Sequence, residues 1–161
     1  MTVNIESQVY SAFDAAALVN KQRQFFNTGK TKDVEFRIQQ LKKLRQLIVD
    51  NEQGIMDALK KDLNKSPMEA YGTEIDFLIA DIDHTLKDIR SLSKPRKVKT
   101  PLFHQLGSSW IQAEPYGVTY IIAPWNYPFQ LALSPVIGAI SAGNTCIIRP
   151  SRMSENTAKI M

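Results

Sequence analysis

The sequence has a single cysteine, no apolar run long enough to span a membrane, and only one short basic cluster. One cysteine excludes an intramolecular disulfide and is typical of a reducing compartment. We therefore expect a cytoplasmic protein without an integral membrane segment. The N-terminal residues, which include Glu6 and Asp14, do not resemble a signal peptide. There is no internal repeat and no low-complexity segment.

The basic cluster runs from Lys94 to Lys99, with prolines at positions 95 and 101. Such a cluster can contact nucleic acid or acidic lipid. It is short, however, and no aromatic residue interrupts it, and the net charge of the chain is only +4. We interpret it as a solvated linker after a helix and expect no nucleic-acid partner.

Apolar residues recur at helical spacing in three stretches of the first hundred residues. The stripes consist of Val34, Ile38, Leu41, Leu44 and Ile48, then Ile55, Leu59 and Leu63, then Ile75, Leu78, Ile79, Ile82, Leu86 and Ile89. The third helix has a strong start signal, because Ser66-Pro67-Met68-Glu69 forms a capping box with proline at the first helical position. A weaker helix is predicted over residues 9–26. With 161 residues, 43% of them hydrophobic, the chain can bury one core.

On the third predicted helix, Asp81, His84 and Asp88 share a polar face. These residue types can bind a metal ion. A solvated helix face explains them better, because no neighbouring group is in place to orient His84 as a ligand. We expect no metal site.

The segment 117–123 is almost continuously apolar, which is typical of a strand that is covered on both faces of a parallel sheet. A helix is predicted from Tyr127-Pro128-Phe129 to about Ala142, with Gly143-Asn144 as its C-terminal cap. A second strand is predicted over residues 145–148. This is a right-handed βαβ unit, and ligands bind outside the carboxyl ends of its strands. Asn126 and Arg149 lie at those ends.

Three sequence blocks in this order resemble the aldehyde dehydrogenase superfamily, and most of all its class 3 branch for fatty and aromatic aldehydes. The blocks are Glu114-Pro115-Tyr116-Gly117-Val118, Ala123-Pro124-Trp125-Asn126-Tyr127-Pro128-Phe129 and Gly138-Ala139-Ile140-Ser141-Ala142-Gly143-Asn144. Ser154-Glu155-Asn156-Thr157-Ala158 strengthens the resemblance, which covers the whole chain, including the helical N-terminal region.

The resemblance implies a role for Asn126. In this family a cysteine thiolate attacks the aldehyde, and negative charge develops on the former carbonyl oxygen of the thiohemiacetal. A fixed amide N–H stabilises that charge, and Asn126 is expected to be this donor. The alternative is that Asn126 only caps the helix that follows, because asparagine is a favoured N-cap residue.

The resemblance also implies cofactor contacts. The backbone of Ile122, Ala123, Pro124 and Trp125 is expected to line the nicotinamide end of NAD or NADP. The family's ribose-binding Lys-Pro-Ser-Glu block here reads Arg149-Pro150-Ser151-Arg152. Two arginines suit a 2′-phosphate better than two ribose hydroxyls, so one hypothesis is a preference for NADP over NAD. Drift in a site that is no longer used is the interpretation that we favour.

The family's nucleophilic cysteine and general-base glutamate are expected beyond residue 161. Cys146 lies within the second apolar strand, where burial raises the pKa of a thiol and makes it unreactive. We therefore expect this chain alone to be inactive with its aldehyde substrate. Two alternatives remain, a non-catalytic nucleotide binder and an interaction module that pairs with a family paralogue or a separate C-terminal half.

The expected architecture is α/β, with a helical N-terminal arm and the first βαβ of a Rossmann-like dinucleotide-binding domain in an incomplete aldehyde dehydrogenase fold. The helical region spans residues 1–100, a β linker spans 101–116, and the partial dinucleotide-binding domain spans 117–161. The segment 110–114 is either a strand that enters this domain or, by resemblance, part of an antiparallel pair outside the main sheet. Two parallel strands leave open edges and an uncovered face, so we expect self-association.

Overall fold

The computed structural model describes the backbone of residues 12–161 and the side chains from residue 15 onwards. The predicted helix start at Val9 and the polar residue Glu6 therefore lie outside the described residues. The elements follow in the order α1 (Ala12–Asn27), η1 (Lys30–Lys32), α2 (Val34–Asp50), α3 (Glu52–Leu63), α4 (Pro67–Ala70), η2 (Tyr71–Ile75), α5 (Asp76–Leu92), β1 (Arg96–Val98), η3 (Leu102–His104), β2 (Ser109–Ile111), β3 (Val118–Ile122), α6 (Gln130–Ser141), β4 (Thr145–Arg149) and α7 (Glu155–Ile160).

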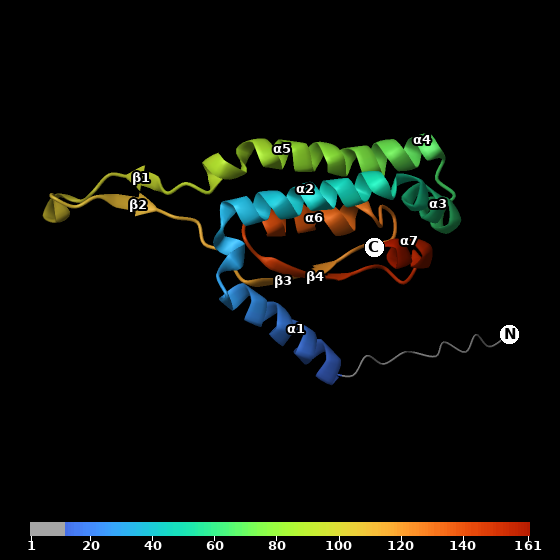
Figure 1. Cartoon of the computed structure of the whole chain (residues 1–161), viewed down its shortest axis with the longest axis horizontal. Coiled ribbons are helices and arrows are strands. Elements are labelled where there is room, and N and C mark those ends of the chain that lie inside the picture. The colour runs from blue at the N-terminus through green and yellow to red at the C-terminus, as the bar shows by residue number, and fades with distance from the viewer. Residues whose placement is uncertain (1–11) are drawn as a thin grey trace.

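The helices and the β3–β4 sheet form layers. Helices α2 and α5 lie side by side, and α6 lies between them and the sheet (Figure 1). The core is built by apolar side chains that are nearly inaccessible to solvent, among them Leu41, Ile48, Ile55, Leu59, Ile75, Leu78, Ile82, Ile89 and Ile137. The expected α/β architecture, with only short sheets in the described residues, is confirmed.

The first two apolar stripes form α2 and α3. Helix α2 begins after Asp33, whose carboxylate accepts hydrogen bonds from the backbone N–H groups of Glu35 and Phe36 at 3.1 and 3.3 Å. This N-cap satisfies two donors that a helix start leaves without partners. None of the described helices is both long and apolar enough to cross a membrane.

The third stripe forms a helical run that is not a regular α-helix throughout. Its predicted start is confirmed, because Ser66 Oγ accepts a hydrogen bond from the backbone N–H of Glu69 at 3.2 Å. One turn later the segment Tyr71–Ile75 winds as a π-helix before α5 begins. A π-turn shifts the angular positions of the residues around it and is often found at functional sites. Apolar periodicity alone did not predict it.

Strands β3 and β4 are parallel, and Ile121 pairs with Ile148. Helix α6 begins two or three residues later than predicted. It ends at Ser141, and Gly143 forms the cap as expected, with a φ of 87°; a Cβ atom at Gly143 would lie 3.0 Å from the carbonyl oxygen of Thr31. The backbone N–H of Asn144 donates to the Ala139 carbonyl at 2.8 Å, as in a Schellman cap.

Asn144 also links this cap to the sheet. Its side-chain oxygen accepts a hydrogen bond from the backbone N–H of Gly117 at 2.8 Å, immediately before β3. The end of α6 and the start of β3 are thereby held together at the amino end of the sheet.

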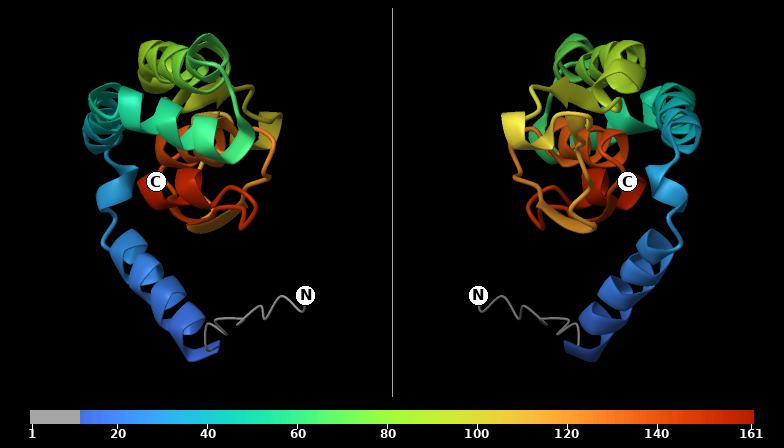
Figure 2. Two further views of the ribbon diagram at one scale, coloured as in Figure 1. Left: turned by 90° about the vertical axis from the view of Figure 1, so that its right-hand side faces the viewer. Right: turned by 90° about the vertical axis from the view of Figure 1, so that its left-hand side faces the viewer.

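The sheet is better covered than expected. Helix α6 covers the face that carries Ile121, and α1 contacts both β3 and β4, so the face that was expected to be uncovered is covered in part. The covering is incomplete, because Tyr120 remains 58% exposed and Ile122 remains 64% exposed. Figure 2 shows α1 extending away from the stacked helices.

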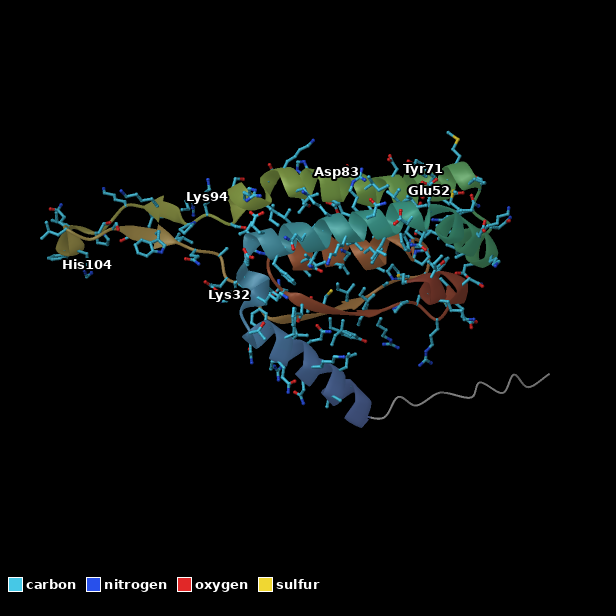
Figure 3. All side chains as sticks on the ribbon, viewed as in Figure 1. Lys32, Glu52, Tyr71, Asp83, Lys94 and His104 are labelled. Atoms are coloured by element: carbon cyan, nitrogen blue, oxygen red, sulfur yellow. The ribbon has the colours of Figure 1, made fainter. Side chains whose placement is uncertain are left out.

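The segment between α5 and β3 forms a hairpin that extends from the helices, with His104 at its tip and Lys94 at its base (Figure 3). Strands β1 and β2 are antiparallel, and Lys97 pairs with Trp110. The antiparallel pair outside the main sheet is thus confirmed, and Trp110 does not enter the β3–β4 sheet. The linker interpretation of the basic cluster is partly wrong, because residues 96–98 form β1, although the basic side chains are exposed.

Candidate active site

The turn that carries Asn126 leaves the carboxyl end of β3 and leads into α6. The backbone N–H of Ala123 still donates to the Arg149 carbonyl at 3.0 Å, so the ladder continues one residue beyond β3. Pro124, Trp125, Asn126 and Tyr127 are exposed. Pro128 and Phe129 are buried and anchor the end of the turn in the core.

Asn126 does not cap α6. An N-cap side chain accepts hydrogen bonds from backbone N–H groups two or three residues further on. Two residues beyond Asn126 is Pro128, which has no N–H, and three residues beyond is Phe129, whose N–H donates to Glu74. The capping explanation for Asn126 is therefore wrong, and another reason is needed for an amide at this position.

The residue that caps α6 is Glu74, in the π-turn. One carboxylate oxygen accepts hydrogen bonds from the backbone N–H groups of Phe129 and Gln130, at 2.9 and 3.1 Å. The other oxygen forms an ion pair with Lys65, which follows α3. Glu74 is 0% exposed and Lys65 is 6% exposed. The start of α6, and with it the end of the Asn126 turn, is held by a buried charge pair.

Neither member of this pair was predicted from the sequence. A signal was present, because Ala70, Glu74, Leu78 and Ile82 are spaced four residues apart and all four are fully buried. A glutamate within an apolar row of a helix must find a partner or remain uncharged. The sequence does not indicate that the partners would be Lys65 and a turn more than fifty residues away.

The second predicted segment, Arg149-Pro150-Ser151-Arg152, lies beside the first. Arg149 pairs with Ile122 in the parallel ladder, so residues predicted to contact the two ends of a dinucleotide meet at the same edge of the sheet. Both arginines are exposed. The Ser151 hydroxyl accepts a hydrogen bond from the backbone N–H of Met153 at 3.2 Å and helps to form the turn.

Helix α7 fixes the far side of this turn. Its first residues donate four hydrogen bonds to the carboxylate of Asp62 in α3, from the backbone N–H and side chain of both Asn156 and Thr157, at 2.7–3.1 Å. Helices α3 and α7 approach so closely that a Cβ atom at Gly54 would lie 2.8 Å from Ile160 Cδ1. Sequence reasoning missed Asp62 as well.

Cys146 lies within β4 opposite Thr119, three residue pairs before the Ile122–Arg149 end of the ladder. The side chain is half-buried, and burial raises the pKa of its thiol. A higher pKa lowers the thiolate fraction at neutral pH and so makes the thiol less reactive. The predicted rise in pKa is confirmed.

The polar face of α5 divides between solvent and protein. His84 is exposed and lies 3.5 Å from Asp88, whereas Asp81 accepts a hydrogen bond from the Ser134 hydroxyl of α6 at 3.0 Å. Asp81 is therefore part of a helix contact and not of the solvated face that was expected. Among the residues that the structure describes, no group of three potential metal ligands converges.

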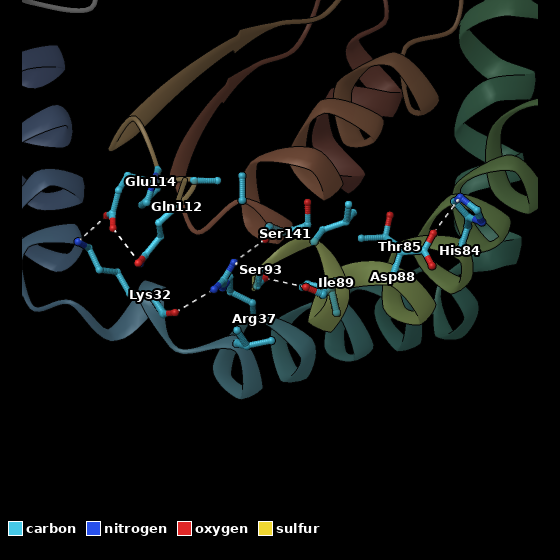
Figure 4. Close-up of a pocket in the computed structure, with 15 residues that line it drawn as sticks. Lys32, Arg37, His84, Thr85, Asp88, Ile89, Ser93, Gln112, Glu114 and Ser141 are labelled. Atoms are coloured by element: carbon cyan, nitrogen blue, oxygen red, sulfur yellow. Dashed lines mark hydrogen bonds and ion pairs between the residues drawn. The ribbon is translucent and has the colours of Figure 1, made fainter. Parts of the chain in front are cut away.

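A cavity of about 420 Å³ lies where α2, α5 and the C-terminal end of α6 meet the hairpin (Figure 4). Arg37 borders it and donates to the carbonyl oxygens of Lys32 and Ser141 and to the Ser93 hydroxyl. Burial lowers the pKa of Arg37 and outweighs the opposing effect of Asp33. The residues predicted to act in catalysis or cofactor binding do not line this cavity, so we interpret it as a junction between elements.

The fold and the carboxyl edge of the sheet define a class of protein, an α/β protein with a dinucleotide-type βαβ unit. A model of the aldehyde dehydrogenase family matches residues 2–161, and the chain belongs to this family.

Two of the similar curated proteins are named as aldehyde dehydrogenases, and one of them belongs to family 3. The chain is 48% identical to 4,4'-diaponeurosporen-aldehyde dehydrogenase from Staphylococcus aureus over 85% of its own length, and 42% identical to aldehyde dehydrogenase family 3 member A2 from Rattus norvegicus over 89%. The chain spans about 30% of the length of these relatives.

The structural comparison agrees with the sequence comparison. A substrate-bound aldehyde dehydrogenase from Staphylococcus aureus superposes with a TM-score of 0.88 at 45% identity, over 91% of this chain and 32% of the solved chain. An aldehyde dehydrogenase from Brucella melitensis superposes with a TM-score of 0.82 at 23% identity, over 93% of this chain and 30% of the solved chain, which shows the shared fold.

Proposed function

We propose that this chain is the N-terminal segment of an NAD(P)-dependent aldehyde dehydrogenase that oxidises aldehydes to carboxylic acids through a cysteine thiohemiacetal. In this proposal Asn126 donates a hydrogen bond to the negatively charged oxygen of the tetrahedral intermediate. The observation that carries the proposal is the exposed Asn126 in a turn whose helix is already capped by Glu74. An amide with no capping task at the carboxyl edge of a parallel strand is suited to a ligand or a reacting group.

The residues at the sheet edge fit a dinucleotide that carries several phosphates. Arg149 and Arg152 are exposed cations, and Arg149 lies beside the end of β3. No carboxylate lies within the segment 149–152 to accept hydrogen bonds from ribose hydroxyls. Guanidinium groups bind phosphate in a bidentate manner. Bound there, NAD or NADP would accept the hydride from the intermediate. We propose NADP as the better fit, with NAD as the alternative.

The chain itself is proposed to be inactive. Its one thiol, Cys146, is half-buried, has a raised pKa, and lies three residue pairs away from the end of the ladder where Asn126 follows. A nucleophile and a general base would have to come from outside these 161 residues. An aldehyde is the proposed substrate of the complete enzyme.

A chimera tests this proposal. Residues 15–161 of this chain would replace the matching segment of the Staphylococcus aureus 4,4'-diaponeurosporen-aldehyde dehydrogenase, and NADH or NADPH formation would be followed with short and long aldehydes. We expect turnover, and we expect Asn126→Ala to lower kcat by about a hundred- to a thousandfold. A folded chimera without turnover, or one that Asn126→Ala leaves fully active, would contradict the proposal.

A second candidate is an interaction module that pairs with a family paralogue, with a separate C-terminal half or with a second copy. The exposed Tyr120 and Ile122 at the sheet and the apolar side chains of the extended hairpin, among them Phe103 and Trp110, favour it. Mixing the chain with the C-terminal two-thirds of the same relative distinguishes the two roles. Restored activity on mixing supports the module, whereas activity only in the covalent chimera supports the segment.

A further inference from the structure

We propose that Glu74 and Lys65 are positioning residues that hold the turn of residues 124–129, and with it the amide of Asn126, in a fixed geometry. The inference rests on the oxyanion role proposed above for Asn126. Neither residue is proposed to contact the reacting groups, and both are buried beside the turn that carries Asn126.

The Glu74–Lys65 pair contacts the turn at the C-terminal end of the turn. The Glu74 carboxylate accepts hydrogen bonds from the backbone N–H groups of Phe129 and Gln130, which are otherwise unpaired donors at the start of α6. Hydrogen bonds to an ionised acceptor are about twice as strong as bonds between neutral groups. The start of α6 also carries the positive end of the helix dipole, which favours a carboxylate there.

The same pair contacts the turn one residue from Asn126. The Lys65 ammonium lies 3.9 Å from the centre of the Tyr127 ring, within the range of a cation–π interaction. The ammonium also pairs with Glu74. The pair therefore holds the end of the turn by backbone hydrogen bonds at Phe129 and Gln130 and by a ring contact at Tyr127. Asn126 is the next residue toward the strand.

The charges of the pair are matched to the proposed chemistry. A lone buried carboxylate close to the turn would repel the negative charge that develops on the reacting oxygen. The Lys65 ammonium neutralises the charge of the Glu74 carboxylate, while the carboxylate continues to accept its hydrogen bonds. A neutral acceptor would cap α6 more weakly, and an apolar residue would leave two buried N–H groups without partners, which is costly.

The π-turn explains how Glu74 reaches α6. Glu74 and Ile75 are adjacent in the chain, yet both are 0% exposed, Ile75 within the core and Glu74 against the start of α6. The π-helix over residues 71–75 widens the turn at this point. The irregularity that apolar periodicity did not predict therefore lies where the positioning contact is made.

Amide hydrogen exchange and NMR spectra of the 161-residue chain test the proposal. In Glu74→Ala we expect exchange at Phe129 and Gln130 to rise about tenfold or more relative to exchange at Leu78 and Ile82, which reports global unfolding; tenfold corresponds to ~1.4 kcal/mol. The side-chain amide resonances of Asn126 should move toward their positions in the urea-unfolded chain.

Two further variants provide rescue and control. In the double variant Lys65→Met/Glu74→Gln an amide oxygen still accepts the two hydrogen bonds and no unpaired charge is left, but the acceptor is neutral and the Lys65–Tyr127 contact is lost. The exchange at the turn and the Asn126 resonances should therefore lie between those of Glu74→Ala and those of the original chain. Asp81→Ala removes a different side-chain contact, the one that Asp81 of α5 makes with Ser134 of α6, and it should leave the turn unchanged.

The proposal is overturned if exchange rises equally at the turn and at Leu78 and Ile82, if it does not rise, or if the double variant is as loose as Glu74→Ala. If Glu74→Ala does not fold, Lys65→Met/Glu74→Met, which fills the same space, leaves no buried charge and removes the acceptor of the two hydrogen bonds, is compared in the same way and decides the question. Failure of the proposed function is distinguishable, because Asn126→Ala would then leave the chimera active while the exchange pattern in this chain still held.

Discussion

Thr157 donates two hydrogen bonds to Asp62, one from its backbone N–H and one from its hydroxyl, each 2.7 Å long. With two more from Asn156, they fasten the first turn of α7 to α3. Because α7 follows the turn of residues 149–154, Asp62 also fixes one end of the segment that carries Arg149 and Arg152. Burial acts to raise the pKa of Asp62, but the hydrogen bonds together outweigh it, and the net shift is downward.

The lowered pKa predicts how the attachment of α7 depends on pH. A carboxyl whose folded pKa lies below its unfolded value of about 3.9 stabilises the fold above that value, and it loses this contribution as pH falls through the folded pKa. We expect the protection of the Thr157 amide, corrected for intrinsic exchange, to be constant from pH 7 to pH 5 and to fall below about pH 4. Hydrogen exchange measured by NMR checks this.

Asp62→Asn should remove most of this pH dependence, because the amide oxygen still accepts hydrogen bonds but does not titrate. Asp57→Asn is the matched control on the same helix, since Asp57 is exposed and accepts a hydrogen bond from the Gln53 side chain of its own helix. If both variants keep the full acid-induced loss at Thr157, Asp62 is not the group that titrates.

Replacement of Lys65 by methionine should destabilise the fold strongly. It leaves the carboxylate of Glu74, which is 0% exposed, without its cation. Breaking a buried pair in this way typically costs about 3–5 kcal/mol. Urea unfolding followed by circular dichroism measures the change in the free energy of unfolding.

Lys159→Met is the control for Lys65→Met. Lys159 pairs with Glu155 at 2.8 Å on the surface of α7, and both side chains are largely exposed. Exposed pairs contribute little, so the unfolding midpoint should not move. Equal changes in the free energy of unfolding for the two lysine substitutions would show that the buried pair stabilises the fold no more than the exposed pair does.

The helical layer could be predicted from the sequence because the spacing of the apolar residues in each stripe indicates which side of the helix is buried. Leu41 and Ile48 in α2, and Ile55 and Leu59 in α3, are buried as their spacing indicates. The Ser66 N-cap and the glycine cap at Gly143 are also local signals, and both formed. Local signals are read correctly when the residues that interact are also close in the sequence.

The contacts that hold the candidate site join residues far apart in the sequence, which is why pattern reasoning missed them. Glu74 and Phe129 are 55 positions apart, and Asp62 and Thr157 are 95 positions apart. A single carboxylate in a helix gives no indication of which distant backbone it will meet. The motif around Asn126 located the turn, but only the structure shows what caps α6 and that Asn126 does not.

Cys146 should react slowly in the folded chain. Burial raises the pKa of its thiol, so less thiolate is present at neutral pH than in the unfolded chain. We expect iodoacetamide to alkylate Cys146 much more slowly in buffer than in urea at the same pH, and we expect no aldehyde-dependent NADH or NADPH formation from this chain. Turnover that is abolished by Cys146→Ala would contradict both expectations.

The chain should bind NAD weakly. The segment 149–152 offers two exposed guanidinium groups and no carboxylate for the ribose hydroxyls. Calorimetric titration should therefore give a dissociation constant weaker than micromolar for NAD, with NADP binding more tightly. Arg152→Glu should remove the preference for NADP, because it restores a carboxylate and removes one cation. A micromolar constant for NAD would contradict the prediction.

The β3–β4 sheet should make the chain self-associate. Tyr120 and Ile122 are 58% and 64% exposed on β3, and strand edges with unpaired N–H and C=O groups favour pairing with another chain. Light scattering should show species larger than a monomer at high concentration. Tyr120→Lys should reduce these larger species, because a charge on an exposed strand blocks association. Phe77→Lys, at an exposed position on α5, should not reduce them.

Hydrogen exchange should be slowest in α2 and α5 and faster in β3. A compact monomer whose slowest exchange lies at Tyr120 to Ile122 would show instead that the two strands are stable without a partner.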